Sequence, residues 1–483
     1  MILARRKIAY WLYEKYSFMK ILMIFMILMS PLLFKMILIF FYRRHVEKKA
    51  KKDITVGFFH PNCNACTPQE NVLWSAVKAI QTEYDNVQIC IYTGDLEAKP
   101  HTILSNVESK FGIKLQPNIR FLYLRKRKWI RSFAYLGSMW VGCEALSLLK
   151  PHIMIDSMGY GFCNFIFKYC GRCTVINYVH NPLVSVDKLK TRYVIHSNNQ
   201  YIITRRPAFS LGVSKGIAFL WGKIGRVADV VMVNSSWTKE NILNIWNCPQ
   251  KAHIVYPPIG LENLMKRADS CLDKKNQFRI MNASEFKPEN NHELILRALN
   301  KARLKIKRNI MDEVRLVLIN LSSEPCESYV QRLKEIVKQQ DLEDYVKIYP
   351  QSMHSNRLEE ELIKATFGIY AKVDDEFGSD LIAGLTTGQI MIVHASGAAK
   401  AELINTEDES RSGYLVKTVD DYAHALEEAL HLSPADKRRM QKASRRIADQ
   451  FSRFAFQKEF LKIIGPFLES KKKKLYNVAC SYA

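Results

Sequence analysis

Short runs of β-branched and other apolar residues alternate with helix-like spacing of polar and apolar residues along most of the chain. In the first half, the apolar runs predict strands at 54–59, 87–92, 119–124, 153–155, 174–179, 230–234 and 253–256. Helical spacing between them predicts helices over 71–82 and 238–245, the second capped by Ser236. Strands that alternate with helices form parallel sheets, because each crossover returns the chain to the same edge.

A second series of the same kind follows the polar stretch 266–277. Here the predicted strands are 278–281, 315–319, 346–349, 367–370 and 390–393, and the predicted helices are 292–302, 328–340, 357–365, 420–430 and 435–450. We therefore expect an α/β protein with two doubly wound, Rossmann-like domains, at 53–265 and 275–468. Such domains form a ligand cleft between the carboxyl ends of their strands, where helix N-termini favour anions.

The N-terminal segment contains an apolar run, residues 21–42. As a helix it would span roughly 33 Å, at about 1.5 Å per residue, which is enough to cross a bilayer core. A signal peptide and an in-plane hairpin are the alternatives, but no small-residue cleavage site precedes the basic cluster after the run. We expect residues 1–52 to form a membrane anchor with a basic flank, and residues 469–483 a basic tail. Six basic residues follow the run closely and five precede it, a bias that favours a cytosolic body.

Composition and charge narrow the function class. Of 483 residues, 48% are hydrophobic and 24% charged, as in an ordered globular protein. The formal net charge of +24 favours an anionic partner, which could be phospholipid, nucleic acid or a phosphorylated substrate. No nucleic-acid-binding motif accompanies the charge, so we do not expect nucleic acid as a partner. The basic run 125–128, beside Trp129, is either a solvated loop or a contact with an anionic membrane surface.

Cysteine usage points to a reducing compartment, because eleven cysteines in a chain of this length do not resemble a secreted disulfide framework. Two pairs with C-x-x-C spacing, Cys63 with Cys66 and Cys170 with Cys173, look like metal knuckles. Their separation far exceeds the about 15–20 residues of a zinc ribbon. We therefore predict no metal site and no cofactor.

Several longer strings are more specific than the fold pattern. In chain order they are His-Pro-Asn-Cys-Asn-Ala at 60–65, Ile-Asp-Ser-Met-Gly-Tyr at 155–160, Tyr-Val-His-Asn-Pro at 178–182, Val-Met-Val-Asn-Ser-Ser-Trp-Thr at 231–238 and Val-Tyr-Pro-Pro at 255–258. Their order and spacing resemble glycosyltransferase family 4, and within it the eukaryotic GDP-mannose-dependent α-1,2-mannosyltransferases that elongate dolichol-linked Man3GlcNAc2 to Man5GlcNAc2. The resemblance covers roughly residues 54–465 and the N-terminal anchor.

This resemblance implies a GT-B fold, with the lipid-linked acceptor on the N-terminal domain and GDP-mannose on the C-terminal domain. It implies a retaining, metal-independent transfer in N-glycan precursor assembly, by a single-pass protein of the endoplasmic reticulum membrane whose body faces the cytosol. The expected partners are GDP-mannose, dolichol-diphosphate-linked oligosaccharide and membrane lipid. The implied site residues are catalytic His180, Asp375 and Glu376; donor-binding Lys287, Asn290, Phe377, Gly378 and Lys400; and acceptor-side His60, Asn64, Glu70, Asp156 and Tyr160.

The sequence departs from the family pattern on the donor side. The family's four-glycine loop corresponds to residues 66–69, which include Pro68, a residue with no backbone N–H to offer a phosphate. An Arg and a Lys that neutralise the leaving diphosphate correspond to Lys287 and Asn290, so one of two charges is lost. Two glutamates correspond to Asp375 and Ala383, and an alanine cannot accept a hydrogen bond from the nucleotide ribose.

Three hypotheses therefore stand at this stage. The first is an active GDP-mannose α-1,2-mannosyltransferase. The second is a non-catalytic paralogue that acts as a partner or scaffold for other glycosyltransferases of the pathway. The third is a related glycosyltransferase with a different donor. The acceptor-side strings match the family better than the donor-side strings do, which keeps the second and third hypotheses open.

Overall fold

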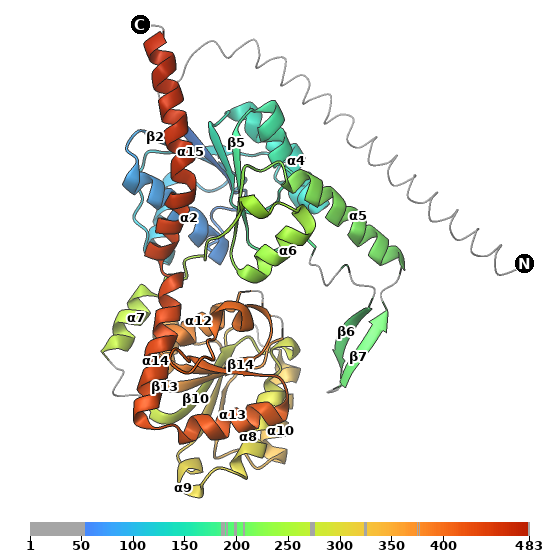
Figure 1. Ribbon diagram of the computed structural model, residues 1–483, viewed down its shortest axis with the longest axis vertical. Helices are drawn as coiled ribbons and strands as arrows, with labels where there is room; N and C mark the ends of the chain where they lie inside the picture. Colours follow the sequence, from blue (N-terminus) through green and yellow to red (C-terminus); the bar gives the residue numbers. More distant parts are fainter. Residues whose placement is uncertain are drawn as a thin grey trace, which may run out of the picture.

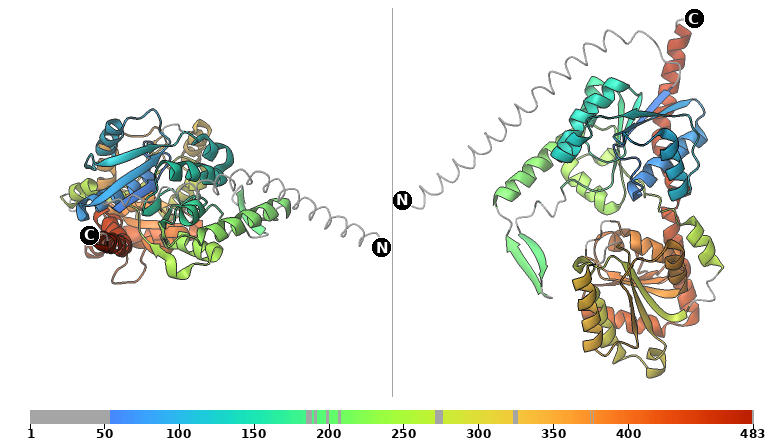
Figure 2. Two further views of the ribbon diagram at one scale, coloured as in Figure 1. Left: turned by 90° about the horizontal axis from the view of Figure 1, so that it is seen from above. Right: turned by 180° about the vertical axis from the view of Figure 1, so that it is seen from behind.

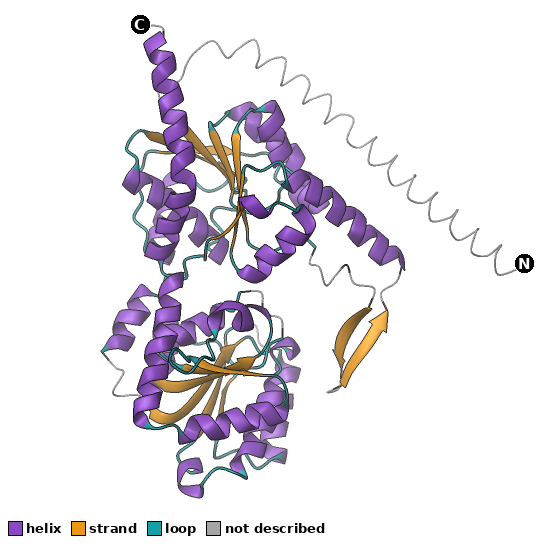
Figure 3. Cartoon of the chain, viewed as in Figure 1, coloured by secondary structure: helices purple, strands orange, loops and turns teal. Residues whose placement is uncertain are grey.

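The computed structural model describes residues 54–184, 189, 192–197, 200–205, 208–270, 276–322, 326–373, 375 and 377–481 (Figure 1). The expected anchor, residues 1–52, lies outside these ranges, and so does Glu376. Within them, we find no helix that combines the length and the apolar character needed to cross a membrane. The described chain forms two α/β domains, which a long C-terminal helix runs along (Figure 1, Figure 3).

The N-terminal domain is built on seven parallel strands in the order β3-β2-β1-β4-β5-β8-β9. The strands are β1 (Ile54–Phe59), β2 (Val87–Thr93), β3 (Ile119–Tyr123), β4 (Ile153–Asp156), β5 (Thr174–Val179), β8 (Val230–Val233) and β9 (Ala252–Ile254). The strand order reverses between β1 and β4, which is where a doubly wound sheet opens a crevice at its carboxyl edge. Phe59 pairs with Asp156 at that edge, so the residues that follow them, His60 and Ser157, come together.

Helices cover both faces of this sheet (Figure 3). They are α2 (Pro68–Glu83), α3 (Pro100–Phe111), α4 (Lys128–Leu148), α5 (Ala208–Gly225) and α6 (Ser236–Trp246). Only α2 and α6 were predicted from spacing, since α4 and α5 carry apolar residues on most of their surface and so lack a clear helical period. A separate antiparallel hairpin, β6 (Arg192–Ser197) with β7 (Gln200–Arg205), lies apart from both domains (Figure 1).

The C-terminal domain repeats the architecture with six parallel strands in the order β12-β11-β10-β13-β14-β15. The strands are β10 (Asn276–Ser284), β11 (Arg315–Asn320), β12 (Val346–Tyr349), β13 (Ala365–Tyr370), β14 (Ile390–His394) and β15 (Gly413–Val416). The helices are α7 (Glu262–Asp269), α8 (His292–Arg303), α9 (Arg308–Met311), α10 (Glu327–Gln339), α11 (Ser355–Lys364), α12 (Ser379–Thr386), α13 (Val419–His431) and α14 (Pro434–Ala448). Its order reverses between β10 and β13, which opens a second crevice.

At two of the expected domain boundaries, the chain packs differently from the sequence prediction. Leu264 and Ala268 of α7 pack with the apolar cluster of Met281, although the N-terminal domain was expected to extend to 265. At the other end, α15 (Arg453–Ser481) crosses from the C-terminal domain to the N-terminal domain, where it lies along α2 (Figure 1).

The apolar stripe of α15 explains this crossing. Phe456, Phe460, Ile464 and Leu468 recur at helical spacing, and all four belong to the apolar core beside α2. Residues 453–468 of the expected C-terminal domain therefore pack with the N-terminal sheet, because that is where their stripe is buried. The expected basic tail continues the same helix as far as Ser481.

Candidate active site

The crevice of the N-terminal domain is shaped by the buried carboxylate of Asp156, the last residue of β4. The carboxylate accepts hydrogen bonds from the backbone N–H groups of Met158 and Gly159, both at 3.1 Å, and of Gly161 at 2.9 Å. Burial raises the pKa of Asp156 to about 6, and these donors oppose the rise. The turn needs glycine at 159, whose φ is +73°, because a Cβ atom there would lie 2.9 Å from the Cα atom of Val179.

A buried polar cluster follows directly from that turn. The Oγ atom of Ser157 lies 2.9 Å from Nδ1 of His60, and Nε2 of His60 lies 3.8 Å from the Oε1 atom of Glu70. The Nε2 atom of His180, at the end of β5, lies 2.9 Å from the carbonyl oxygen of Ser157. Burial lowers the pKa of His180 to about 4, so its imidazole is neutral at physiological pH. Four of the predicted residues, His60, Glu70, Asp156 and His180, are thus brought together around Ser157, which the prediction had not included.

The segment that replaces the family's glycine loop has its own local structure. Cys66 adopts a left-handed φ of +59°, and Pro68 is the first residue of α2, where a missing N–H costs no hydrogen bond. The Oε2 atom of Glu70 accepts a hydrogen bond of 2.6 Å from the backbone N–H of Thr67. The N-terminus of α2 is therefore capped by a carboxylate of the chain itself, which occupies the position that an anionic ligand would favour.

Asn64 faces away from the cluster around His60, whereas Tyr160 borders that cluster. The side-chain oxygen of Asn64 accepts a hydrogen bond of 2.9 Å from Asn106 of α3, which turns Asn64 toward that helix. The ring of Tyr160 packs edge-on against Phe59 with centroids 6.3 Å apart. Of these two predicted acceptor-side residues, Asn64 thus has a structural partner outside the cluster.

The crevice of the C-terminal domain contains a small pocket at the ends of β10, β13 and β14. It is lined by Asn282, Ser284, Asn290, Tyr370, Ala371, Lys372, Asp375, Asp380, Leu381, Val393, His394 and Ala399. His292 supports its floor, because Nε2 of this histidine lies 3.0 Å from Oγ of Ser284 and 3.1 Å from the side-chain oxygen of Asn282. Burial lowers the pKa of His292 to about 3, so it too is neutral.

Of the charged residues that line this pocket, Asp375 was predicted, whereas Lys372 and Asp380 were not. Lys372 contributes an ammonium group, 3.3 Å from the Oδ1 atom of Asp375. Burial, and secondly the charge of Asp375, raise the pKa of Asp380 to about 6. Sequence reasoning missed Lys372 and Asp380, although a lysine two positions after a predicted buried strand was a usable signal.

The predicted donor-binding residues occupy several environments. Asn290 lines the pocket and donates a 2.6 Å hydrogen bond to the carbonyl oxygen of Glu285. Lys287, on the same turn, forms an ion pair with the carboxylate of Glu285, and its side chain is 54% exposed. Lys400 is exposed on the helical turn Ala399–Leu403. Of these three predicted residues, Asn290 is the one that lines the pocket.

Gly378 and Phe377 shape the loop before α12. Gly378 has a φ of +72°, and a Cβ atom there would lie 2.6 Å from Cδ1 of Leu403, so glycine is required. The ring of Phe377 packs against Phe451, with centroids 5.9 Å apart. Ala383 packs against the apolar cluster that contains Met281, so its position has apolar neighbours.

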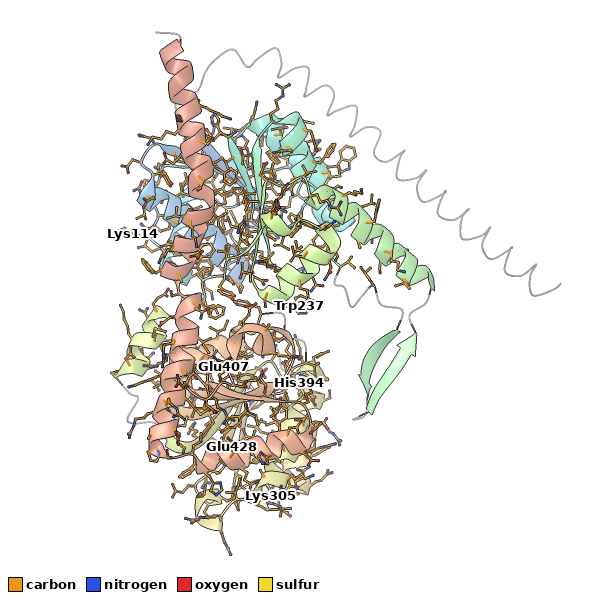
Figure 4. All side chains as sticks on the ribbon, in the orientation of Figure 1. Lys114, Trp237, Lys305, His394, Glu407 and Glu428 are labelled. Carbon is orange, nitrogen blue, oxygen red and sulfur yellow. The ribbon has the colours of Figure 1, made fainter. Side chains whose placement is uncertain are left out.

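The two crevices face each other across a direct contact between the domains. Glu402 of the C-terminal domain accepts a hydrogen bond from the backbone N–H of Ser236, at the N-terminus of α6. Trp237, the next residue, lies at the edge of the N-terminal domain that faces the C-terminal domain, where His394 is found (Figure 4). Ser236 follows β8 and Glu402 follows β14, so the carboxyl edges of the two sheets come together at this contact, an arrangement that suits a reaction between two separately bound molecules.

The basic run 125–128 and the cysteine Cys63, which the sequence analysis also singled out, have local partners. In the basic run, Arg127 pairs with Asp95 at 2.6 Å, and Lys128 begins α4. The Sγ atom of Cys63 lies 3.2 Å from Oγ1 of Thr93. Within the part of the chain that the structure describes, no three His, Cys, Asp or Glu side chains are grouped in a way that could hold a metal ion.

Known proteins resemble both halves of this arrangement. Residues 53–246 match the family described as ALG11 mannosyltransferase N-terminus, and residues 267–447 match the family described as Glycosyl transferases group 1. A solved glycosyltransferase from Rickettsia africae ESF-5 has a TM-score of 0.58 at 12% identity, over 88% of this chain and 99% of that one. The apo form of the lipopolysaccharide outer core galactosyltransferase WaaB has a TM-score of 0.57 at 13% identity, over 86% and 99%. At these identities the likeness concerns the fold alone, and it agrees with the expected GT-B arrangement of two Rossmann-like domains.

Two relatives named GDP-Man:Man(3)GlcNAc(2)-PP-Dol alpha-1,2-mannosyltransferase are closer in sequence. The Xenopus laevis protein is 32% identical over 441 residues, which cover 88% of this chain and 90% of the relative. The Homo sapiens protein is 32% identical over 433 residues, which cover 86% and 87%. Because this similarity spans both domains, the chain belongs to the family of GDP-Man:Man(3)GlcNAc(2)-PP-Dol alpha-1,2-mannosyltransferases.

Proposed function

We propose that this protein transfers mannose from GDP-mannose to dolichol-diphosphate-linked Man3GlcNAc2, forming α-1,2 linkages with retention of configuration. The observation that carries the proposal is the 32% identity to relatives of that name over 88% of the chain. The contact between the carboxyl edges of the two sheets supports it, because group transfer needs donor and acceptor held together. The proposal includes no cofactor and no metal.

The donor site of the proposal is the pocket at the carboxyl edge of the C-terminal sheet. Lys372 supplies a positive charge for the diphosphate, and the backbone N–H groups at the start of α12 point to the same crevice. Asp375 would contact the donor sugar, with Asn290 and the rim residues Lys287 and Lys400 nearby. Phe377 and Gly378 would hold the loop, and Glu376 is a further candidate for the sugar contact.

The acceptor side of the proposal is the cluster around Ser157. Neutral His180 can form hydrogen bonds with a sugar hydroxyl without presenting a positive charge to it. His60, Glu70 and Asp156 would orient the loop that carries Ser157 and Tyr160, and Asn64 would support the neighbouring turn. In this proposal the expected anchor within residues 1–52 holds the protein at the endoplasmic reticulum membrane, with both domains in the cytosol beside the lipid acceptor.

A non-catalytic paralogue is the second candidate, and specific observations favour it. Lys287 is paired with Glu285, and Ala383 has apolar neighbours. Two donor contacts that the family resemblance implies are therefore absent or occupied at the described positions. Such a protein would keep the acceptor lipid and associate with other glycosyltransferases of the pathway.

A transfer assay separates the two candidates. The full chain in detergent is incubated with radiolabelled GDP-mannose and a synthetic Man3GlcNAc2-diphosphate lipid, and the product is digested with an α-1,2-specific mannosidase. We expect a labelled product from which the α-1,2-specific mannosidase releases the label. If no transfer occurs although calorimetry detects acceptor-lipid binding, the paralogue explanation replaces the proposed function. Transfer from another nucleotide sugar alone would instead support an altered donor.

A further inference from the structure

The helical turn Ala399–Leu403 of the C-terminal domain connects the pocket of that domain with the N-terminal domain. Ala399 lines the pocket, and the same turn contacts α6 of the N-terminal domain. Both ends of the turn are buried in the apolar cluster that contains Met391 and Val393 of β14. Because this core fixes the turn within its own domain, a shift of the turn against α6 would also move the pocket relative to the N-terminal domain.

Glu402, on this turn, places its carboxylate at the N-terminus of α6, at the level where the two domains meet (Figure 1, Figure 2). Its Oε1 atom accepts a hydrogen bond from the backbone N–H of Ser236, the first residue of that helix. The N–H groups of a first helical turn have no partner within the helix. The N–H of Thr238 is bonded to the hydroxyl of Ser235, whereas the partner of the Ser236 N–H comes from the other domain. The helix dipole also favours a carboxylate at this end.

The segment that links the domains gives the same carboxylate a second partner. The hydroxyl of Tyr256 is hydrogen-bonded to Glu402, and the ring of Tyr256 packs against Phe451 with centroids 4.7 Å apart. Burial, and secondly the charge of Glu402, raise the pKa of Tyr256, so its hydroxyl keeps the hydrogen that it donates. Glu402 itself is half-buried, which limits the competition of water for these bonds. One side chain therefore joins the pocket wall, the linker and the N-terminal domain.

We propose that Glu402 is a positioning residue for group transfer, whose carboxylate sets the place of the donor pocket relative to the acceptor domain by holding Ser236. Glu402 does not itself line the pocket, so it acts on the geometry between the domains and not on donor binding. Trp237 follows Ser236 directly and is half-buried at the edge that faces the C-terminal domain, so the same bond fixes its backbone (Figure 4). Transfer depends steeply on such placement. The kinetic consequence rests on the proposed function, whereas the contact does not.

Two variants remove the bond from opposite sides in the full chain. Glu402→Ala removes the acceptor, and its matched control is Glu407→Ala, an exposed carboxylate of the same domain. Ser236→Pro removes the donor, because proline has no N–H and is well tolerated at the first position of a helix. The backbone before it is already extended, as a residue before proline requires, with φ −160° and ψ 163° at Ser235. Ser236→Ala is the control on this side, since it keeps the N–H.

We expect Glu402→Ala and Ser236→Pro each to lower kcat/KM for mannosyl transfer by about tenfold, with the Kd for GDP changed by less than about twofold. The double variant should be no less active than either single one, because both remove the same bond. Losses that multiply in the double variant overturn the proposal, and so do equal losses in Glu407→Ala or Ser236→Ala. A parallel loss of GDP affinity in Glu402→Ala would assign this residue to donor binding and overturns it too.

Hydrogen exchange tests the contact without requiring activity. In the detergent-solubilised protein, the amide of Ser236 should exchange at least about tenfold faster in Glu402→Ala than in the unmodified chain and in Glu407→Ala, while circular dichroism verifies that the fold is kept. If the unmodified protein transfers no mannose, the proposed function fails and this measurement alone decides about the contact. Unchanged exchange at Ser236 in Glu402→Ala overturns the inference in either case.

Discussion

Nε2 of His180 lies 2.9 Å from the carbonyl oxygen of Ser157, at the point where β4 and β5 end beside each other. A carbonyl oxygen only accepts hydrogen bonds, so Nε2 carries the hydrogen. Because burial lowers the pKa of His180 to about 4, the ring is neutral and Nδ1 keeps its lone pair. The Ser157 backbone thereby selects the tautomer with the hydrogen on Nε2.

His180→Ala should lower kcat/KM by about a hundredfold, because it removes the buried neutral imidazole that the Ser157 carbonyl orients in the proposed site. Steady-state kinetics with GDP-mannose and the lipid-linked acceptor measure the loss. The matched control is His253→Ala, since His253 is exposed on β9 of the same domain and should keep full activity. Equal activity of the two variants would remove His180 from the proposed catalytic group.

Lys372→Ala should weaken GDP binding by about tenfold, because a charge-assisted hydrogen bond to the diphosphate is lost. Lys287→Ala should have a smaller effect, since Lys372 lines the pocket and Lys287 does not. Isothermal calorimetry with GDP on the detergent-solubilised protein compares the two. A larger loss for Lys287→Ala would mean that the turn at 285–290 closes onto the donor and that the lysine leaves its present partner.

Phe460→Ala should destabilise the N-terminal domain by about 3–4 kcal/mol, although the residue lies in the last helix of the chain. Its side chain is buried in the core beside α2 and stacks on Phe456 with ring centroids 5.7 Å apart. Phe454→Ala is the control, because Phe454 is on the same helix and 76% exposed. Denaturant unfolding should separate the two variants, and similar midpoints would contradict the packing of α15 on this domain.

Acidification should destabilise the protein through its buried neutral histidines. Burial lowers the pKa of His292 from 6.5 to about 3, so the unfolded state binds a proton that the folded state excludes. Stability from this group is present above pH 6.5 and is lost as the pH falls toward 3, by about 2 kcal/mol between pH 7 and pH 5. Asp156 and Asp380, with pKa values raised to about 6, act in the opposite direction between pH 6 and 3.8.

His292→Gln isolates the histidine contribution, because both aspartates remain in the variant. Its unfolding free energy should fall less than that of the unmodified protein when the pH is lowered from 7 to 5. His101→Gln, an exposed substitution on α3, should keep the full pH dependence. Parallel pH profiles for all three proteins would show that His292 is not the titrating group.

The sequence by itself determined the class of fold, because the local pattern of apolar and polar residues specifies where strands and helices form. Alternating β-branched runs and amphipathic stretches predicted both parallel sheets, and the structure confirms them. The strings around Asp156 and His180 pointed to one family, and the similarity to its members confirms that assignment. These features depend on neighbouring residues, which a sequence presents directly.

Only the tertiary structure decided which distant residues meet. Ser157 joins His60 because β1 and β4 are neighbours in the sheet, although the two residues are 97 positions apart. Phe460 packs on the N-terminal core because α15 crosses between the domains, and the apolar helices α4 and α5 gave no period from which to find them. Lys372 lines the pocket of the C-terminal domain, whereas Lys287 pairs with Glu285 outside that lining. The charge of each side chain can be taken directly from the sequence. The direction of a side chain depends on packing between elements, and the sequence does not show where those elements lie relative to one another.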